Sequence, residues 1–222
     1  MLIQPITCSP WQSNCYLVRT GPAATEAIVV DPGVTAATPV AAALEAAGVR
    51  PVALLATHGH FDHIGDAHLL ARRYAIPLYL AAPDRHLLTR PGAGLGPHGD
   101  AMVERLIGTT VTPDVDDVRG LDAPFTAAGL SVTPFAAPGH TEGSTLLTVS
   151  DGTEVAVFTG DVLFAGTIGR TDLPSGNMSE MRETLLRIRA AFPDDVALLP
   201  GHGPGTTLAA EKDGNRFMHD EM

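Results

Sequence analysis

The chain has 222 residues, of which 45% are hydrophobic and 18% charged, which is enough for one compact domain with a buried core. Its 25 acidic residues outnumber 14 Lys and Arg, for a formal net charge of −11. This excess argues against binding to nucleic acid or to an anionic membrane, since both need basic patches. The apolar content, with 23 Gly and 18 Pro spread along the chain, excludes disorder and collagen. We therefore expect a single domain over residues 1–222.

The cysteines and the N-terminus indicate the compartment. Cys8 and Cys15 form neither a disulfide framework nor a CxxC pair. The first residues lack the basic segment and apolar core of a secretory signal. The longest apolar runs, such as 27–30 and 52–56, are too short to span a bilayer. We expect a soluble cytoplasmic protein with free thiols.

Short apolar runs alternate with helical patterns in the first half of the chain. The expected strands are residues 14–19, 26–31, 52–56 and 77–80. A helix is expected over residues 39–47, with Thr38 as its cap and Gly48 at its end. A second helix is expected over residues 62–74. Its inward-facing residues are expected to be Ile64, Leu69 and Leu70.

Residues 91–100 break all periodicity and predict a mobile loop, either over a site or as an inert connector. The strands expected after it are residues 118–121, 130–136, 144–149, 155–159 and 196–199. An amphipathic helix is expected over residues 178–192, with an apolar stripe of Met181, Leu185, Ile188 and Phe192. Both halves of the chain end in a strand and a His-bearing loop, which suggests two facing sheets with helices outside.

The chemistry concentrates in residues 57–63 (THGHFDH), where an expected buried strand gives way to a helix. Three crowded imidazoles would repel one another when protonated, and a bound metal ion holds them neutral. His58 and His60, two apart in an extended stretch, point the same way and can chelate one ion. Asp62 and His63 diverge from that pair and suit a second ion, roughly 3.5–4 Å away as in two-metal hydrolytic sites.

Three further donors each follow a glycine at the end of an apolar strand, namely His140, Asp161 and His202. The small residue lets backbone and metal approach closely, and a strand end is a rigid place from which to aim a ligand. We assign one ion to His58, His60 and His140, the other to Asp62, His63 and His202, and a bridging role to Asp161. Imidazole and carboxylate without thiolate favour Zn, Fe or Mn.

This ordered pattern, THGHFDH followed by Gly-His, Gly-Asp and Gly-His, resembles the metallo-β-lactamase-fold hydrolases over nearly the whole chain. The resemblance implies an α/β fold, a four-layer αββα sandwich with the metals at one edge. Residues 161–174 are similar to the segment after the bridging Asp in short glyoxalase II-like (hydroxyacylglutathione hydrolase-like) enzymes, and less so to persulfide dioxygenases. The tail at 206–217 is also glyoxalase II-like, although Arg216 departs from the usual Asn-Pro-Phe.

The resemblance implies hydrolysis of a small-molecule thioester of the S-D-lactoylglutathione type. Asp31 resembles an acid that supports the ligands, and a turn Asp before Pro-Gly is an equal alternative. Arg170 stands where a basic residue meets glutathione in the family, and an ion pair with Asp172 is equally open. Full-length glyoxalase II enzymes use a helical C-terminal domain for glutathione. Only 20 residues follow His202 here, so those contacts cannot be carried over and the thiol stays open.

The expected cofactors are two divalent ions, zinc first, with iron or manganese open. The nucleophile would be a water shared by both ions, its pKa lowered towards about 7, with Asp62 orienting it. One alternative is a persulfide dioxygenase whose single iron is held by His58, His140 and Asp161. Another is a different hydrolase of the fold, such as a lactonase, β-lactamase or phosphodiesterase. A non-catalytic scaffold is disfavoured because no ligand is missing, and the oligomeric state is not indicated.

Overall fold

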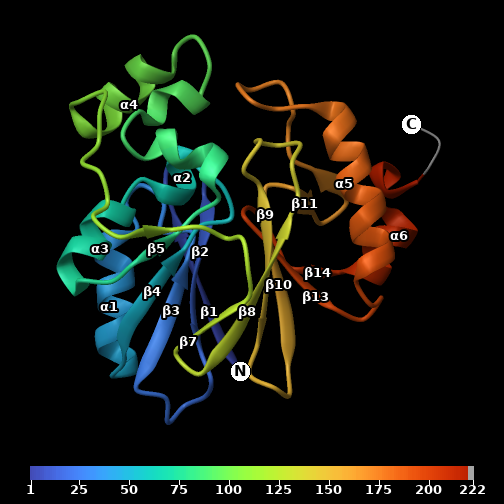
Figure 1. Ribbon diagram of the computed structural model, residues 1–222, viewed down its shortest axis with the longest axis horizontal. Helices are drawn as coiled ribbons and strands as arrows, with labels where there is room; N and C mark the ends of the chain where they lie inside the picture. The colour runs from blue at the N-terminus through green and yellow to red at the C-terminus, as the bar shows by residue number, and fades with distance from the viewer. Residues whose placement is uncertain (220–222) are drawn as a thin grey trace.

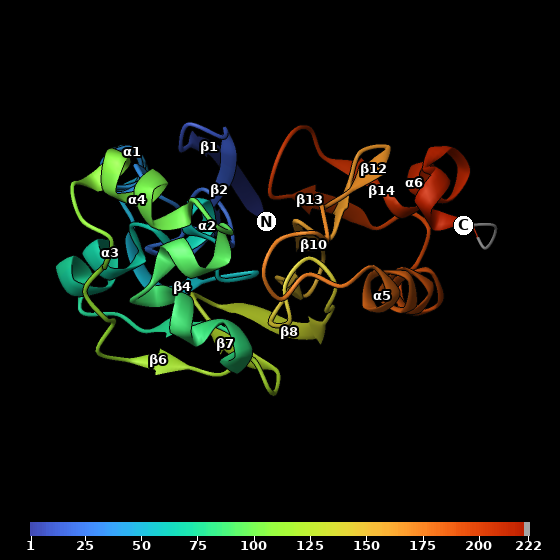
Figure 2. The ribbon, with the colours of Figure 1, turned by 90° about the horizontal axis from the view of Figure 1, so that it is seen from above.

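Two six-stranded sheets face each other in the computed structural model, which describes residues 1–219. Figure 1 shows α1 and α3 outside the first sheet, and α5 and α6 outside the second. Figure 2 shows the same layers from above. The expected four-layer αββα sandwich is therefore confirmed.

The first sheet is antiparallel at its N-terminal edge and parallel beyond it. Its strands, in spatial order, are β1 (Leu2–Cys8), β2 (Ser13–Arg19), β3 (Glu26–Val30), β4 (Arg50–Leu55), β5 (Leu78–Tyr79) and β6 (Val118–Arg119). Parallel pairing runs from β3 to β6. The carboxyl ends of β3 and β4 therefore lie at one edge, where Asp31 and the 57–63 segment follow.

The second sheet also brings proposed ligands to the carboxyl ends of its parallel strands. Its strands, in spatial order, are β14 (Thr206–Thr207), β13 (Ala197–Pro200), β10 (Val155–Gly160), β9 (Thr145–Ser150), β8 (Leu130–Ala136) and β7 (Phe125–Ala127). Because β10 and β13 are parallel, Asp161 and His202 leave the sheet at the same end. A short hairpin of β11 (Leu163–Phe164) and β12 (Thr167–Ile168) follows Asp161.

Helices cover the outer faces. The α-helices are α1 (Ala37–Ala47), α2 (Phe61–Ile64), α3 (Ala67–Tyr74), α4 (Gly99–Ile107), α5 (Met178–Ala191) and α6 (Leu208–Gly214), and the 3-10 helices are η1 (Ala82–Leu88), η2 (Pro91–Gly94) and η3 (Arg216–Met218). The expected amphipathic helix is confirmed as α5, which begins where the Asn177 side chain accepts the N–H groups of Ser179 and Glu180. Over residues 1–219, no helix combines the length and apolar content needed to cross a membrane.

The expected helix over residues 62–74 is wrong in one respect, because the structure divides it. α2 ends at Ile64 and α3 begins at Ala67. A Cβ at Gly65 would lie 2.6 Å from the Phe61 carbonyl and 2.8 Å from Val34, so the chain turns where only glycine fits. Leu69, expected to face inward, is 48% exposed, because the buried stripe runs through Ile64, Ala67, Leu70 and Ala71, and helical spacing places Leu69 off that stripe.

Two further expectations need correction. Thr38 does not cap α1, because α1 begins at Ala37 and Thr38 lies inside it. The Asp66 carboxylate instead accepts the Ala37 N–H at 2.8 Å. Residues 91–100 are not one irregular loop, since they hold η2 and the start of α4. A Cβ at Gly99 would lie 2.0 Å from the Gly92 carbonyl, so glycine permits a packing that hydrophobic periodicity cannot reveal.

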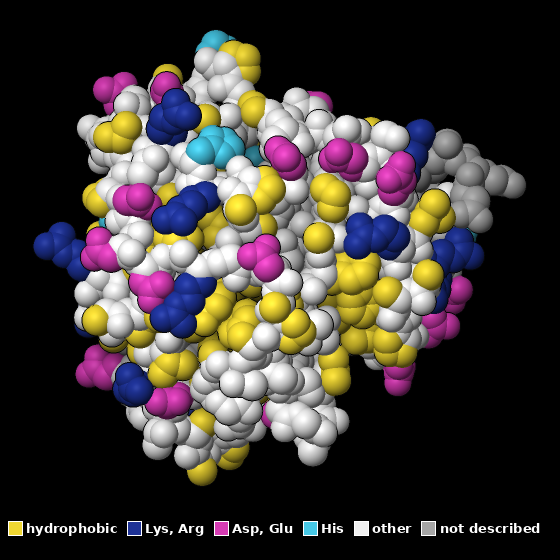
Figure 3. Space-filling model, in the orientation of Figure 1, with side chains coloured by type: hydrophobic (Ala, Val, Ile, Leu, Met, Phe, Trp, Pro, Cys, Tyr) yellow, Lys and Arg dark blue, Asp and Glu magenta, His cyan; other side chains and the backbone are white. Residues whose placement is uncertain are grey.

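Apolar side chains fill the space between the two sheets. Phe158 on β10 lies at the centre of this layer, 1% exposed, with its ring edge-on to Tyr16 at 5.1 Å between centroids. Val155, three residues earlier on the same strand, is 48% exposed. On the face shown in Figure 3, acidic and basic side chains of the described residues are interspersed and gather into no basic patch.

We expect Phe158→Ala to lower the free energy of unfolding by about 3–5 kcal/mol, because it leaves a cavity between the sheets. Val155→Ala, on the same strand but facing solvent, is the control and should change it by about 0.5 kcal/mol or less. Denaturant unfolding followed by circular dichroism measures both. Equal effects of the two substitutions would contradict this placement of the core.

Candidate metal centre

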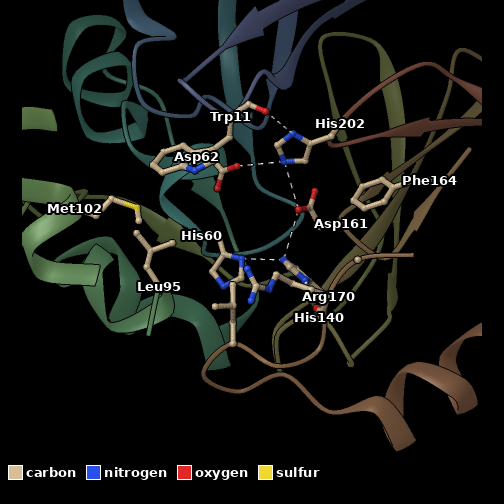
Figure 4. Close-up of a pocket in the computed structure, with 12 residues that line it drawn as sticks. Trp11, His60, Asp62, Leu95, Met102, His140, Asp161, Phe164, Arg170 and His202 are labelled. Atoms are coloured by element: carbon tan, nitrogen blue, oxygen red, sulfur yellow. Dashed lines mark hydrogen bonds and ion pairs between the residues drawn. The ribbon is translucent and has the colours of Figure 1, made fainter. Parts of the chain in front are cut away.

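The imidazoles and carboxylates predicted as ligands meet at one edge of the sandwich. His58, His60, Asp62 and His63 follow β4, while His140, Asp161 and His202 follow β8, β10 and β13. Figure 4 shows five of them, from both halves of the chain, directed at a common space. The structure thus brings together all seven side chains, and their role as ligands stays a prediction.

Three groups of donors lie close enough to hold an ion. In each group the donor atoms lie within 4.8 Å of one another, and the groups are His58 with His60 and His140, His58 with His63 and Asp161, and Asp62 with His63 and His202. The first and third are the two triads expected from the sequence. Asp161 lies between them, 3.3 Å from His63 Nε2, 3.4 Å from His202 Nε2 and 3.6 Å from His140 Nε2.

Unpaired polar atoms show that this cluster fits a cation. In the part of the chain that the structure describes, the buried side-chain atoms without a hydrogen-bond partner are His58 Nε2, His60 Nε2, His63 Nε2 and Asp161 Oδ1. A buried polar atom left unpaired costs about 1–3 kcal/mol. All four belong to the same cluster, and all are atoms that coordinate metals. The His-rich site and the fold together imply divalent metal binding.

Burial and charge divide the cluster into two electrostatic halves. Burial, and then the neighbouring imidazoles, lower the pKa of His58 far below its usual range and that of His60 to about 3. Both rings are therefore neutral at physiological pH, with a lone pair free for a ligand bond. Neutral imidazole is the form that binds a metal ion.

The carboxylates dominate the other half of the cluster. Burial lowers the pKa of His202, but hydrogen bonds to Asp161 and Asp62 outweigh it and raise that pKa to about 9. Burial likewise opposes ionisation of Asp62 and Asp161, yet the charge on His63 holds the pKa of both carboxyls below the usual range. Two ionised carboxylates in a buried site attract positive charge, whether protons or a metal ion.

Contacts behind the cluster fix the ring orientations. Asp31 accepts the Thr57 N–H and hydroxyl, each at 2.7 Å, and His63 Nδ1–H at 3.0 Å. The Nδ1–H of His140 donates to the Arg170 carbonyl at 2.7 Å, and that of His202 to the Trp11 carbonyl at 3.1 Å. Such contacts turn Nε2 towards a metal. Asp31 is therefore both a turn residue, with φ of 52°, and a support for His63.

Glycines make room for the cluster. A Cβ at Gly201 would lie 2.2 Å from Asp161 Oδ1 and 2.6 Å from His63 Cε1. A Cβ at Gly160 would lie 2.3 Å from the Thr57 hydroxyl. The expectation that a small residue before the donor allows close approach is confirmed at these two positions.

A cavity of about 400 Å³ opens beside the cluster. Its apolar lining residues are Trp11, Leu95, Met102, Phe164 and Leu173. Sequence reasoning named none of these five as cavity residues. Leu95 lies in the 91–100 segment expected near a site, and Phe164 and Leu173 lie in the glyoxalase II-like segment 161–174, but Trp11 and Met102 belong to no pattern singled out in the sequence. His98 of that segment is exposed.

Arg170 both lines the cavity and forms an ion pair. Its Nε and one terminal nitrogen donate to Asp172, each at 2.7 Å. The ion pair with Asp172 left open by the sequence is therefore present, and the role of Arg170 as a substrate contact stays a prediction.

A four-layer sandwich with imidazoles and carboxylates gathered at one edge is the arrangement expected of the metallo-β-lactamase fold. The sequence pattern of the Metallo-beta-lactamase superfamily matches residues 8–202, and the chain belongs to that superfamily. Proteins similar to it over most of their length include two from Bacillus subtilis and Streptococcus pyogenes named as probable metallo-hydrolases.

Three similar proteins bear on the metal and the substrate. The structure of the BLEG-1 B3 metallo-β-lactamase is 30% identical with a TM-score of 0.83, covering 98% of this chain and 99% of that one. TTHA1623, solved in a di-iron-bound form, is 33% identical with a TM-score of 0.78, covering 96% and 99%. The hydroxyacylglutathione hydrolase GloC of Haemophilus influenzae is 28% identical over the full length of both chains.

We expect Gly201→Ala to weaken metal binding about 10-fold or more, because the new methyl group displaces Asp161 and His63. Gly214→Ala is the control, since a Cβ there meets nothing within 4 Å. Metal content after dialysis measures the effect, with circular dichroism to confirm the fold. Full metal content in Gly201→Ala would contradict the geometry described here.

Proposed function

We propose that the protein is a metal-dependent thioester hydrolase of the hydroxyacylglutathione hydrolase type. The observation that carries the proposal is the pair of donor triads with Asp161 between them, opening onto a cavity. The similarity of residues 161–174 to the glyoxalase II-like segment and the likeness to GloC support the thioester class. The likeness to a B3 β-lactamase at comparable identity makes β-lactams the substrates to test against it.

The proposed ligands are those of the two triads. His58, His60 and His140 would hold one ion, and Asp62, His63 and His202 the other, with Asp161 shared between them. Divalent ions at these places would supply Lewis acidity, which makes water nucleophilic near neutral pH and polarises a carbonyl oxygen. Zinc is the proposed metal, and iron is the main competitor because TTHA1623 holds iron.

The side chain proposed to act on water is Asp62. It lines the cavity, and its Oδ2 lies 3.2 Å from His202 Nε2. A carboxylate held there accepts a hydrogen bond from water and directs the oxygen lone pair at the acyl carbon. Water adds to the acyl carbon and gives a proton to the Asp62 carboxylate. Collapse of the tetrahedral adduct then breaks the C–S bond and releases the carboxylic acid and a thiolate, which leaves readily because thiols are far more acidic than alcohols, and Asp62 returns the proton to the thiolate or to solvent.

No protein nucleophile is needed for this reaction. Cys8 and Cys15 are buried in the core between the first sheet and its helices, and neither lines the cavity. The cavity walls instead position the substrate. Trp11, Leu95 and Met102 offer apolar surface to an acyl or thiol group, and Arg170 offers a cation to a carboxylate of the thiol.

Removal of metal should abolish thioester hydrolysis, and addition of zinc, iron(II) or manganese(II) should restore it. Metal analysis of the restored protein should give two ions per chain. The assay panel is S-D-lactoylglutathione, the lactoyl ester of a small neutral thiol, a β-lactam and a lactone. Activity that survives the chelator, or turnover of the β-lactam alone, would reject the proposal; oxygen uptake with glutathione persulfide would favour the dioxygenase.

His60→Ala and Asp161→Asn should each lower kcat/KM by about 10²-fold or more, since each removes a donor from the centre of the cluster. His86→Ala is the control, because this exposed imidazole donates to the Pro83 carbonyl of its own helix and lies outside the donor cluster. Circular dichroism should show all three variants folded. Near-normal turnover in either site variant would contradict the ligand assignment.

A further inference from the structure

A buried carboxylate outside the proposed ligand set ties together two of the loops that carry ligands. Asp84, on η1, is 1% exposed. Its Oδ2 accepts the Gly59 N–H at 2.8 Å and the Thr141 hydroxyl at 2.7 Å, and its Oδ1 accepts the Gly143 N–H at 3.0 Å. Hydrogen bonds to an ionised carboxylate are about twice as strong as those between neutral groups.

The partners of Asp84 alternate with proposed metal ligands along the chain. Gly59 lies between His58 and His60, and Thr141 directly follows His140. The first loop leaves β4 of one sheet, and the second leaves β8 of the other. Asp84 therefore links the two sheets at the place where the triad of His58, His60 and His140 assembles.

The fit around this carboxylate leaves no room for a side chain on either loop. A Cβ at Gly59 would lie 2.8 Å from the Asp84 Cβ, and one at Gly143 would lie 2.5 Å from the Asp84 Cγ. The backbone of both loops thus packs directly on the carboxyl group. A shift of that group would move both loops, and with them three imidazoles.

We propose that Asp84 is a positioning residue that sets the spacing of the triad of His58, His60 and His140. The inference rests on the proposed assignment of these three residues to one metal ion. Asp84 does not act on substrate; it acts by holding two loops at the separation that lets their imidazoles converge on one ion. Loss of its acceptor atoms weakens that ion site and leaves the triad of Asp62, His63 and His202 intact.

A second buried carboxylate, Glu211, is the control that distinguishes a positioning role from a purely structural one. Glu211 is 3% exposed and also accepts three hydrogen bonds, from the Gly166 N–H at 2.9 Å, the Thr206 hydroxyl at 2.7 Å and the Asn215 amide at 2.8 Å. Its partners are not proposed ligands. If buried carboxylates matter here only for stability, Asp84→Asn and Glu211→Gln should lower the melting temperature alike and leave metal affinity unchanged.

The test measures the affinity of each zinc site by competition with a chromophoric chelator, and the cobalt(II) absorption spectrum as a second readout. In Asp84→Asn, an amide N–H₂ group, itself a donor, replaces one oxygen that accepts hydrogen bonds from the two loops. We expect the zinc affinity of the site of His58, His60 and His140 to fall about 10–100-fold, while the affinity of the other site stays unchanged. Thr141→Val removes one of the three hydrogen bonds at similar volume and should weaken the same site less. Glu211→Gln should leave both affinities unchanged.

The outcomes separate the two proposals. Zinc affinities within twofold of the wild type in both Asp84→Asn and Thr141→Val overturn the role of Asp84, as does an equal loss in Glu211→Gln. If Asp84→Asn does not fold, Thr141→Val decides alone. A wild-type protein that binds no metal rejects the proposed function instead, and a wild type that binds two ions without cleaving thioesters leaves the positioning role standing.

Discussion

Burial of imidazole and carboxylate atoms without partners is the constraint on which the rest of this structure depends. Within residues 1–219, the side-chain atoms left unpaired in the interior are gathered at one edge of the sandwich, on His58, His60, His63 and Asp161. Cations held by the two donor triads, with Asp161 between them, would satisfy these four atoms and balance the two carboxylates. Bound positive charge would offset the cost of burying these groups, which gives a physical reason for their burial at this edge.

The fold meets this constraint by placing the cluster on the seam between its two sheets. The Asn14 N–H donates to the Gly201 carbonyl at 2.7 Å, and the Tyr16 hydroxyl donates to the Pro200 carbonyl at 2.7 Å, so β2 of one sheet contacts the segment before His202. The Thr145 N–H donates to the Thr57 carbonyl at 2.8 Å on the opposite side. Short hydrogen bonds between the two sheets thus hold the proposed ligands of both sheets close together. A substitution that leaves a cavity between the sheets is therefore expected to weaken metal binding as well.

The sequence was informative where signals are local and silent where they depend on tertiary contacts. The donor residues could be predicted because THGHFDH and the three Gly-linked donors are short patterns, and α5 because its periodicity is strong. The close packing of Gly65 against Val34, which lies far away in the sequence, could not be predicted from helical periodicity. Trp11 and Met102 of the cavity wall, and Asp84, could not be predicted for the same reason: each owes its place to neighbours from other segments, and none lies in a motif.

The two interpretations of Arg170 are compatible once exposure is considered. Its bidentate contact with Asp172 is geometrically good, but the side chains are 60% and 70% exposed, and solvent screens such pairs until they contribute little. Exchange of the Asp172 carboxylate for a carboxylate on a substrate would then cost little, because one charge-assisted pair replaces another. Under the proposed function, an ion pair at the cavity rim that opens easily would let the same pocket accept both anionic and neutral thiols, and Asp172 would pair with the guanidinium when no anion is bound.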